Sequence, residues 1–505
     1  SYDRALALKP DYPEALFNRG DALSELGRYE DALSSYTAAV ALNPEFAKAF
    51  PYAQGSIACT RLRLCDWAAG EETVDRIVDR CLAGDRVLVP FGSYMLRDSA
   101  LLQYRCGRNF VADQNPASPH PLWQGERYAH DRIRVAYVSY DFREHMIAYQ
   151  LAGVVEHHDR SRIETTALSV YPKATGGIQD RLRNAFERFV DVSGQGDIDV
   201  ARLVRELEVD ILVDLMGHTR GARMGIFAQR PAPIQVSFNC PGTTGADYFD
   251  YLVADRIVVP PEHHPYFTEK VVYLPDTCQP NDSKRPGAWR TPSRGEAGLP
   301  ERGFVFCSFN TSYKFRPAVF DVWMRLLLKI EGSVLWLSGG NSTVIGNLRR
   351  EAQARGVHPE RLIFARRIDR MEDHLARHGL ADLFLDTLPY NAQTTASDAL
   401  WAGLPVLTCL GGALSGRVAA SVLTAVGLPE LITHSLEEYE ALAASLAQEP
   451  ERLRRMRDTL ARNRLTHPLF DTARFTRHLE AAFEQMWQIY GRGEAPRHFA
   501  VAPIQ

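Results

Sequence analysis

Several features are scarce or missing in this sequence of 505 residues, and each absence narrows what the chain can do. No apolar run approaches the ~20 residues that a membrane-spanning helix needs, so we expect no membrane partner. The formal net charge is only -4, which gives no electrostatic case for binding nucleic acid or an anionic membrane. No charged segment followed by an apolar stretch and a small-residue cleavage site opens the chain, so no secretory leader is expected.

Metal and disulfide motifs are missing as well. The eight cysteines are scattered singly, and none forms a Cys-x-x-Cys pair. We therefore expect neither a zinc site nor a disulfide framework, and a reducing, cytoplasmic location. Asp197 and Asp199 have the spacing of a motif that binds a metal-diphosphate complex. They open a predicted helix, however, and are better explained as residues that cap it. The sequence predicts no metal and no cofactor.

A repeat with a period of 34 residues opens the chain. The first motif returns at a constant shift: Tyr2, Ala5, Leu8 and Pro10 recur as Tyr36, Ala39, Leu42 and Pro44. Period and residue types are those of the tetratricopeptide repeat, in which Gly20 and Ala32 let two helices approach closely. The pattern fits poorly after about residue 50, although residues 56–110 still read as helical. Ser1 falls within a repeat, so we expect the array to continue before it.

Two further regions alternate buried-strand runs with helical stretches, which predicts mostly parallel sheets flanked by helices. Polar segments rich in proline separate the regions. The predicted fold class is α/β, with helical tetratricopeptide-type repeats (1–120), an N-terminal Rossmann-like lobe (121–278), a linker (279–302) and a C-terminal Rossmann-like lobe with closing helices (303–505). Such lobes bind ligands at the carboxyl ends of their strands.

Residues 386–408 carry the sharpest chemical signal. A predicted strand ends at Asp386 and a helix begins near Thr394. Thr394 and Thr395 would place two hydroxyls beside free backbone N–H groups, an arrangement apt for a diphosphate. Asp398 lies one turn further on and could accept hydrogen bonds from a ribose. Taken alone, the threonines are explained more simply as helix caps, because caps are common.

Other candidates follow predicted strands or share a helix face. Lys314 follows a strand of the second lobe and could neutralise charge on a leaving phosphate. His374 and Arg377 are three residues apart on one helix face and could hold a base and a phosphate. His145 and His218 follow strands of the first lobe and would face the crevice. Each of these residues, taken alone, has an ordinary structural explanation.

Together these motifs resemble the O-linked N-acetylglucosaminyltransferases, glycosyltransferase family 41. The resemblance rests on long motifs spread over most of the chain: VSYDF, GARMGIFAQRPAPIQVSFNCPGTTGA, FNTSYK, VLWL, LADLFLDT, TTASDALWAGLPVLT, SGRVAAS and PLFDTARFTRHLEAAFEQMW. It implies a GT-B arrangement of the two lobes, inversion at the anomeric carbon without a metal, and repeats that guide the acceptor protein. The chain looks like a compact bacterial member with few repeats.

The resemblance also implies roles for single residues. It implies a set of UDP-sugar contacts: Lys314, Thr394 and Thr395 at the diphosphate with Gln393 preceding them, Asp398 at the ribose, and His374 and Arg377 beside the nucleotide. Gln393 stands where animal enzymes carry a histidine, and His218 stands where they carry a tyrosine. His145 matches a histidine proposed as the base near the acceptor.

The sequence therefore predicts a transferase that moves N-acetylglucosamine from UDP-GlcNAc to Ser and Thr hydroxyls of proteins or peptides held by the repeat groove. Lys314 and the two threonines would stabilise the departing UDP, and His145 or His218 would take the acceptor proton. Two alternatives stay open: a UDP-glucose-dependent protein N-glycosyltransferase, and a repeat scaffold with a silent transferase lobe. Natural acceptors, the exact donor sugar and the oligomeric state are not specified by the sequence.

Overall fold

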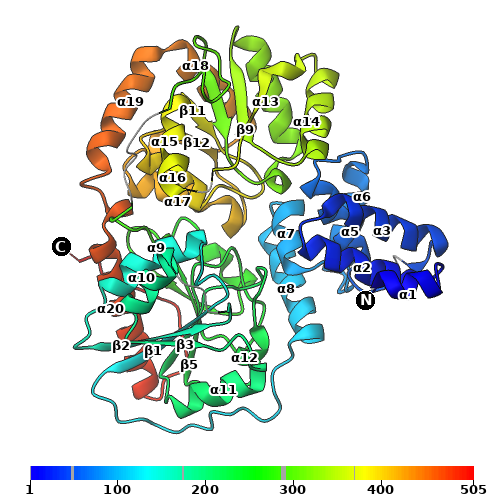
Figure 1. Cartoon of the computed structure of the whole chain (residues 1–505). Helices are drawn as coiled ribbons and strands as arrows, with labels where there is room; N and C mark the ends of the chain where they lie inside the picture. The colour runs from blue at the N-terminus through cyan, green and yellow to red at the C-terminus, as the bar shows by residue number, and fades with distance from the viewer. Residues whose placement is uncertain (1, 47–49, 173–175, 286–291, 369, 505) are drawn as a thin grey trace. The chain divides into compact units, whose positions relative to one another are not determined.

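The structure is a computed structural model that describes residues 2–46, 50–172, 176–285, 292–368 and 370–504. The chain forms two compact units (Figure 1). The first unit contains residues 1–109, 287–412 and 430–457, and the second contains residues 110–286, 413–429 and 458–505. Residues 286–291 of the expected linker lie outside the described residues. The predicted fold class is confirmed, because N-terminal helices precede two parallel sheets.

The N-terminal region is helical throughout its described part. Its helices are α1 (Tyr2–Leu8), α2 (Pro13–Glu25), α3 (Tyr29–Leu42), α5 (Ala53–Arg63), α6 (Gly70–Leu82), α7 (Pro90–Leu96) and α8 (Ala100–Gln114). Helices α2 and α3 form the repeat that the 34-residue period predicts, and Gly20 permits their close approach. A Cβ atom at Gly20 would lie 2.5 Å from the Tyr36 ring, which the 2.7 Å hydrogen bond from Tyr36 to the Asp21 carboxylate holds in place.

The sheet of the first unit is parallel in every recorded pair. Its strands are β8 (Val305–Ser308), β9 (Val334–Ser338), β10 (Leu362–Ala365), β11 (Leu383–Leu385), β12 (Val406–Cys409) and β13 (Ile432–Thr433). They lie in the order β10-β9-β8-β11-β12-β13. The accompanying elements include η2 (Ser312–Lys314), α13 (Pro317–Lys329), α14 (Ser342–Ala354), α15 (Met371–Arg377), α16 (Thr394–Trp401), α18 (Leu436–Gln448) and α19 (Pro450–Asn463), of which residues 450–457 belong to this unit.

The sheet of the second unit is also parallel, in the order β14-β7-β6-β5-β4-β1-β2-β3. Its strands are β1 (Ile133–Ser139), β2 (Ile163–Ser169), β3 (Arg188–Asp191), β4 (Ile211–Asp214), β5 (Ile234–Ser237), β6 (Tyr251–Ala254), β7 (Lys270–Tyr273) and β14 (Phe499–Ala500). The accompanying elements are α9 (Met146–Glu156), α10 (Gly177–Ala185), α11 (Asp197–Glu206), α12 (Met224–Ala228), η1 (Pro261–Tyr266), α17 (Val418–Ala425) and α20 (Thr472–Gly491).

Both faces of this second sheet are buried, as parallel sheets require. Strand β1 shows the alternation directly: Val135 and Tyr137 enter one core, together with residues of α9, α10 and α20. Ala136 and Val138 enter the other core, together with residues of α11 and α12. The successive side chains of a strand point to opposite faces, so each strand supplies both cores.

The C-terminal helix α20 belongs to the second unit. Its apolar residues are buried in the same core as β1, and a buried hydrogen-bond chain joins it to the sheet. Tyr137 bonds His158 at 2.9 Å, and the other ring nitrogen of His158 lies 2.9 Å from Glu480 of α20. The sequence-based division grouped 303–505 together, whereas the compact units assign residues 413–429 and 458–505 to the other sheet.

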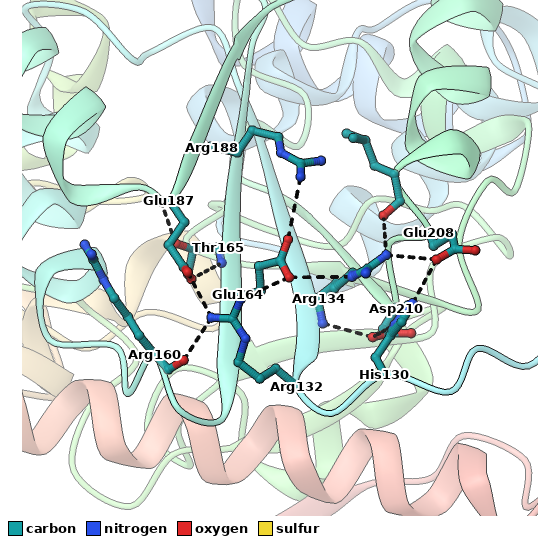
Figure 2. Close-up of polar contacts among 11 residues, drawn as sticks. His130, Arg132, Arg134, Arg160, Glu164, Thr165, Glu187, Arg188, Glu208 and Asp210 are labelled. Atoms are coloured by element: carbon teal, nitrogen blue, oxygen red, sulfur yellow. Dashed lines mark hydrogen bonds and ion pairs between the residues drawn. The ribbon is translucent and has the colours of Figure 1, made fainter.

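An ionic network joins the amino ends of β1 to β4 (Figure 2). Arg132 contacts Glu187 at 2.9 Å and Glu164 at 3.2 Å. His130 bridges Glu208 and Asp210 at 3.1 and 3.0 Å. The network lies at the opposite ends of the strands from the loops that bind ligands in parallel sheets, so we read it as structural. Of the helices in the described ranges, none has the length and apolarity needed to cross a membrane.

The close approach at Gly20 predicts a local loss of stability in Gly20→Ala. The added methyl group would meet the Tyr36 ring at 2.5 Å, so we expect a cost of about 1–3 kcal/mol from overpacking. Hydrogen exchange of α2 and α3 would measure it. Gly346→Ala in α14 is the matched control, because nothing lies within 4 Å of its Cβ position, and it should gain about 0.5–1 kcal/mol. Equal protection in Gly20→Ala and wild type would contradict the packing.

Candidate functional site

Strand order reverses between β8 and β11 in the first unit. From β8 the chain proceeds to β9 and β10 on one side, and β11, β12 and β13 lie on the other side. The loops that follow β8 and β11 therefore leave the sheet side by side at its carboxyl edge. In open parallel sheets such a reversal is the usual place for a ligand. Lys314 lies in the first of these loops, and Gln393 lies in the second.

Asp386 holds the loop that follows β11. Its buried carboxylate accepts hydrogen bonds from the Ala392 N–H at 2.6 Å and from the Thr408 hydroxyl at 2.7 Å. Burial raises the pKa of Asp386 to about 6, and these hydrogen bonds oppose that rise. The carboxylate thus fixes the backbone just before α16 begins.

Helix α16 begins with an uncapped turn. Gln393 occupies the N-cap position, and its side chain makes no capping hydrogen bond. Thr394 and Thr395 are the first residues inside the helix and are half-buried. They therefore do not serve as the N-cap, which was the simpler explanation of their sequence position. The positive end of the helix dipole and two hydroxyls meet at this point.

Lys314 connects the two loops. Its side chain is only 7% exposed, and its Nζ donates a hydrogen bond of 2.7 Å to the Asn391 carbonyl. The same Nζ lies 3.9 Å from the centre of the Tyr390 ring. Burial lowers the pKa of Lys314 to about 8, while the nearby Asp386 acts to raise it. A buried ammonium at a strand-order reversal is suited to bind an anion.

His374 and Arg377 lie on α15, next to α16. His374 Nε2 lies 3.6 Å from the buried Asp398 carboxylate. The Arg377 guanidinium stacks 4.2 Å from the centre of the Phe309 ring, and it donates to the Arg366 carbonyl at 3.3 Å. Burial lowers the pKa of Arg377 to about 10, so it remains a cation at neutral pH.

Several residues of this region were not predicted as site residues from the sequence: Phe309, Tyr390 and His378. In the sequence, nothing distinguishes the first two from other aromatic residues. Only the fold shows that Arg377 lies over the Phe309 ring and Lys314 over the Tyr390 ring. His378 Nδ1 bonds the His374 carbonyl at 3.0 Å, and burial lowers the pKa of His378 to about 3, which keeps the ring neutral. The adjacent His-x-x-x-His spacing on one helical turn was the available signal.

Buried oxygens without partners surround the same loops. In the described part of the chain, these are Ser308 Oγ, Asn310 Oδ1, Asn391 Oδ1 and Ser397 Oγ. Buried polar atoms are nearly always hydrogen-bonded, so this set is an unusual concentration of unsatisfied groups at the two loops. No group of three or more His, Cys, Asp or Glu side chains among the described residues is arranged to hold a metal ion.

The second unit has its own reversal of strand order, between β1 and β4. His145 lies in the loop after β1 and caps α9, with its Nδ1 3.4 Å from the Ile147 nitrogen. The same Nδ1 lies 3.3 Å from an Asp141 carboxylate oxygen, and the side chain is 37% exposed. Burial lowers the pKa of His145, and Asp141 opposes this. Nδ1 cannot accept from Ile147 and donate to Asp141 at the same time; when Nδ1–H donates to Asp141, Nε2 is the acceptor nitrogen of the ring.

His218 lies in the loop after β4. Its Nε2 donates a hydrogen bond of 2.7 Å to the Thr244 carbonyl, which leaves Nδ1 as the acceptor nitrogen. Burial lowers the pKa of His218 to about 4. Asp214 holds the preceding turn by accepting hydrogen bonds from Met216 and Gly217 at 3.0 and 2.7 Å. The structure thus groups the predicted nucleotide residues in the first unit and the two candidate bases in the second.

Buried Glu269 holds the loop that His218 contacts. The carboxylate accepts hydrogen bonds from the Thr243 hydroxyl at 2.7 Å and the Thr244 N–H at 2.6 Å. It also accepts from the Thr244 hydroxyl and from the Thr268 hydroxyl. A carboxylate with this many donors is stable while buried, and it fixes the carbonyl to which His218 bonds.

Most of the chain matches one protein family. The model of glycosyl transferase family 41 matches residues 117–286 and 281–479, and that of the tetratricopeptide repeat matches residues 13–46. The chain belongs to glycosyltransferase family 41. The resemblance stated from the sequence motifs is thereby confirmed, and the loops described above are those of a family 41 protein.

Individual relatives agree with this assignment. One from Arabidopsis thaliana, named "Probable UDP-N-acetylglucosamine--peptide N-acetylglucosaminyltransferase SEC", is 38% identical over 73% of this chain and 38% of its own length. A relative named SPINDLY from Oryza sativa is 33% identical over 74% of this chain and 41% of its own length. The chain thus spans about two fifths of these relatives. The solved structure of a Thermobaculum terrenum O-GlcNAc transferase mutant has 30% identity, covers 97% of this chain and 94% of its own, and gives a TM-score of 0.80.

The contacts of Glu269 predict that Glu269→Gln destabilises the second unit of this family 41 protein. In the glutamine side chain, an NH2 group replaces one of the two carboxylate oxygens and would face the N–H and O–H donors of the loop. We expect the free energy of unfolding to fall by about 1–3 kcal/mol. Chemical denaturation would measure the loss. Glu262→Gln is the control, because Glu262 is exposed in the nearby η1 and its change should be near zero. Equal midpoints for the two variants would show that Glu269 does not hold the loop.

Proposed function

We propose that this chain is an inverting, metal-independent glycosyltransferase. It transfers N-acetylglucosamine from UDP-GlcNAc to Ser and Thr hydroxyls of proteins. The observation that carries the proposal is the bridge that Lys314 makes between the two loops at the strand-order reversal, beside the uncapped start of α16. The names of the relatives, which specify UDP-N-acetylglucosamine and peptide, support the donor and acceptor class.

The donor half of the mechanism uses the first unit. Lys314, Thr394 and Thr395 bind the diphosphate and stabilise the negative charge that grows on UDP as the bond to the sugar breaks. Their charge and dipoles are already oriented by Asp386 and Asn391, so little reorganisation accompanies the reaction. A cation and a helix terminus thereby take the place that a metal ion fills in other sugar-nucleotide enzymes.

The nucleoside is held by the remaining residues of the same unit. Asp398 binds a ribose hydroxyl, and His374, 3.6 Å from it, lies beside the nucleotide. Arg377 supplies a second positive charge near the nucleotide. Gln393 occupies the N-cap position of α16, but its side chain makes no capping hydrogen bond. On this proposal the side chain contacts the donor next to the two threonines.

The acceptor half uses a histidine of the second unit. The acceptor oxygen forms a bond to the anomeric carbon as the bond to UDP breaks, and its proton passes to the base. We rank His145 above His218, because Asp141 supports the positive charge of a protonated His145. Burial lowers the pKa of His218 to about 4, which makes it the weaker base. The role of His218 is then to orient the acceptor or to relay its proton.

The helical region is proposed to hold the acceptor protein through its repeat groove. The match of residues 13–46 to a tetratricopeptide repeat supports this, since such repeats stack into extended binding surfaces. We place the reaction in the reducing cytoplasm, which suits a chain whose eight cysteines are all free thiols.

Calorimetric titration with UDP in the presence of EDTA tests the donor site. Wild type should bind without a metal, and Lys314→Met should lose at least about tenfold in affinity and 10²–10³ in turnover, because one transition-state donor is removed. Absence of UDP binding by wild type would contradict the proposal and favour a silent scaffold. Turnover of Lys314→Met within a few-fold of wild type would refute the leaving-group role.

The pKa of Lys314 predicts an alkaline limit to binding. The ammonium is present below about pH 8 and is lost as the pH rises through that value. UDP affinity should therefore fall above about pH 8, whereas free lysine would keep its charge to above pH 10. Titration of wild type and Lys314→Met between pH 6.5 and 9.5, in matched buffers, measures the difference. A slope of equal size in both proteins would show that another group causes it.

Replacement of the two histidines separates their roles. His145→Ala should lower kcat by about 10²–10⁴ if His145 is the general base, with little change in UDP affinity. His218→Ala should cost less. Mass spectrometry of the modified peptide, with UDP-GlcNAc and UDP-glucose compared, reports the sugar and the residue that receives it. Full activity in His145→Ala would remove it as the base, and glucose on asparagine would establish the N-glycosyltransferase alternative.

A further inference from the structure

Four aromatic rings meet around the loop that follows β11, and we call Phe91, Tyr94, Tyr313 and Tyr390 the aromatic cluster. Phe91 and Tyr94 come from helix α7, Tyr313 from η2, and Tyr390 from the loop between β11 and α16. Ring centres lie 5.9 Å apart for Tyr94 and Tyr390, and 6.2 Å apart for Phe91 and Tyr390. Tyr313 lies 5.7 Å from Phe91 and 6.2 Å from Tyr390.

Tyr390 connects this cluster to Lys314. The Nζ atom of Lys314 lies 3.9 Å from the centre of the Tyr390 ring, on which the other three rings converge. At that distance the ring face attracts the cation, and it also keeps water from the ammonium. The Asn391 carbonyl, one residue on, takes the hydrogen bond from the same Nζ. The position of Lys314 therefore depends on where Tyr390 lies.

The helical region holds the other side of the Lys314 loop. The Ser312 hydroxyl donates to the Arg63 carbonyl of α5 at 2.7 Å, and Arg316 pairs with Glu71 of α6 at 2.9 Å. Arg316 is only 6% exposed. Residues two positions before and two positions after Lys314 are thus bound to two helices, while α7 supplies rings that pack against Tyr390. The helical region and the Lys314 loop belong to the same compact unit.

We propose that the aromatic cluster is a positioning device for Lys314, through which helix α7 of the helical region sets where the ammonium meets the leaving diphosphate. The proposal rests on the function proposed above. It adds a second role for the helical region, which on this view supports the chemistry as well as the acceptor. Tyr390 and Tyr94 are positioning residues, because they act through Lys314 rather than on the substrate.

The surroundings of Lys314 give the device a measurable signature. The acidic group that faces the ammonium is Asp386, and the titratable groups around it on the other elements are the phenols of Tyr313, Tyr390 and Tyr94. Burial raises the pKa of the Tyr313 phenol. Loss of the Tyr390 ring removes the attraction of its face for the ammonium and also part of the desolvation that lowers the Lys314 pKa. The Lys314 pKa should then shift from its wild-type value while the position of the ammonium becomes less defined.

The experiment compares Tyr390→Leu, Tyr390→Phe and Tyr94→Leu with wild type in the full chain. Phe46→Leu is the matched control: Phe46 is a buried helical-region aromatic, and its ring contacts recorded among the described residues are with Phe17 at 5.8 Å and Phe50 at 4.8 Å. For each protein, kcat and KM with an acceptor peptide, the Kd of UDP and the melting temperature are measured. The Lys314 pKa is measured separately by competitive acetylation across pH 7–11 with mass spectrometry, which needs no activity.

We expect Tyr390→Leu to lower kcat about tenfold to hundredfold, as small displacements of catalytic groups do, and to shift the pH at which Lys314 titrates. Tyr390→Phe should restore both values, and Tyr94→Leu should show the same changes in weaker form. Phe46→Leu should lower only the melting temperature.

The proposal is overturned if Tyr390→Leu leaves kcat and the Lys314 titration as in wild type, or if Phe46→Leu shifts the titration equally. Failure of this inference is distinguishable from failure of the proposed function. If only the inference fails, wild type binds UDP and Lys314→Met loses turnover, but the Tyr390 and Tyr94 variants behave as wild type. If the proposed function fails, wild type itself does not bind UDP, and the inference fails with it.

Discussion

The place of the first strand in each sheet is the constraint on which the rest of this structure depends. Strands β1 and β8 both lie inside their sheets, with later strands added on either side. The chain must therefore reverse direction across the sheet once in each unit, and two loops leave side by side at the carboxyl edge. Lys314 and the start of α16 lie at one reversal, and His145 and His218 lie at the other. The candidate chemistry follows from this topology.

Buried carboxylates convert these loops into defined surfaces. Asp386 binds the backbone before α16, Asp214 binds the turn before His218, and Glu269 binds the Thr243 and Thr244 loop. Burial raises the pKa of Asp214 to about 7 and that of Asp386 to about 6. These groups thus carry a desolvation cost, which hydrogen bonds to backbone N–H groups offset. This cost falls at the loops that carry the candidate site residues Lys314, Gln393 and His218.

The helical region packs tightly against the rest of the first compact unit, to which it belongs. Helices α5, α6 and α7 contact the residues on both sides of Lys314 through Arg63, Glu71 and the Phe91 ring, which packs on Tyr313. A module that only held an acceptor could be joined by a flexible linker. Here the loop that carries Lys314 packs directly against helices far away in the sequence. Mutations in the helical region should therefore be followed by kinetic as well as binding measurements.

The sequence by itself determined the class of each region and the residue types at the site. The 34-residue period predicts α2 and α3, the alternation of strand and helix predicts two parallel sheets, and the motifs around Lys314 and Thr394 indicate family 41. Such patterns are local, because they reflect which face of an element is apolar. They also show which residues end a strand or begin a helix.

Only the tertiary structure decided which elements are partners. It joins Lys314 to Asn391, separated by 77 residues, and it brings the rings of α7 against Tyr390. It also places α20 in the sheet core of the second unit rather than with the lobe that precedes it in the chain. The apolar face of an element indicates that the face is buried, but it does not identify the element against which it packs. The partner is chosen by the packing of the whole chain, and so the surroundings of Lys314 could not be obtained from the sequence.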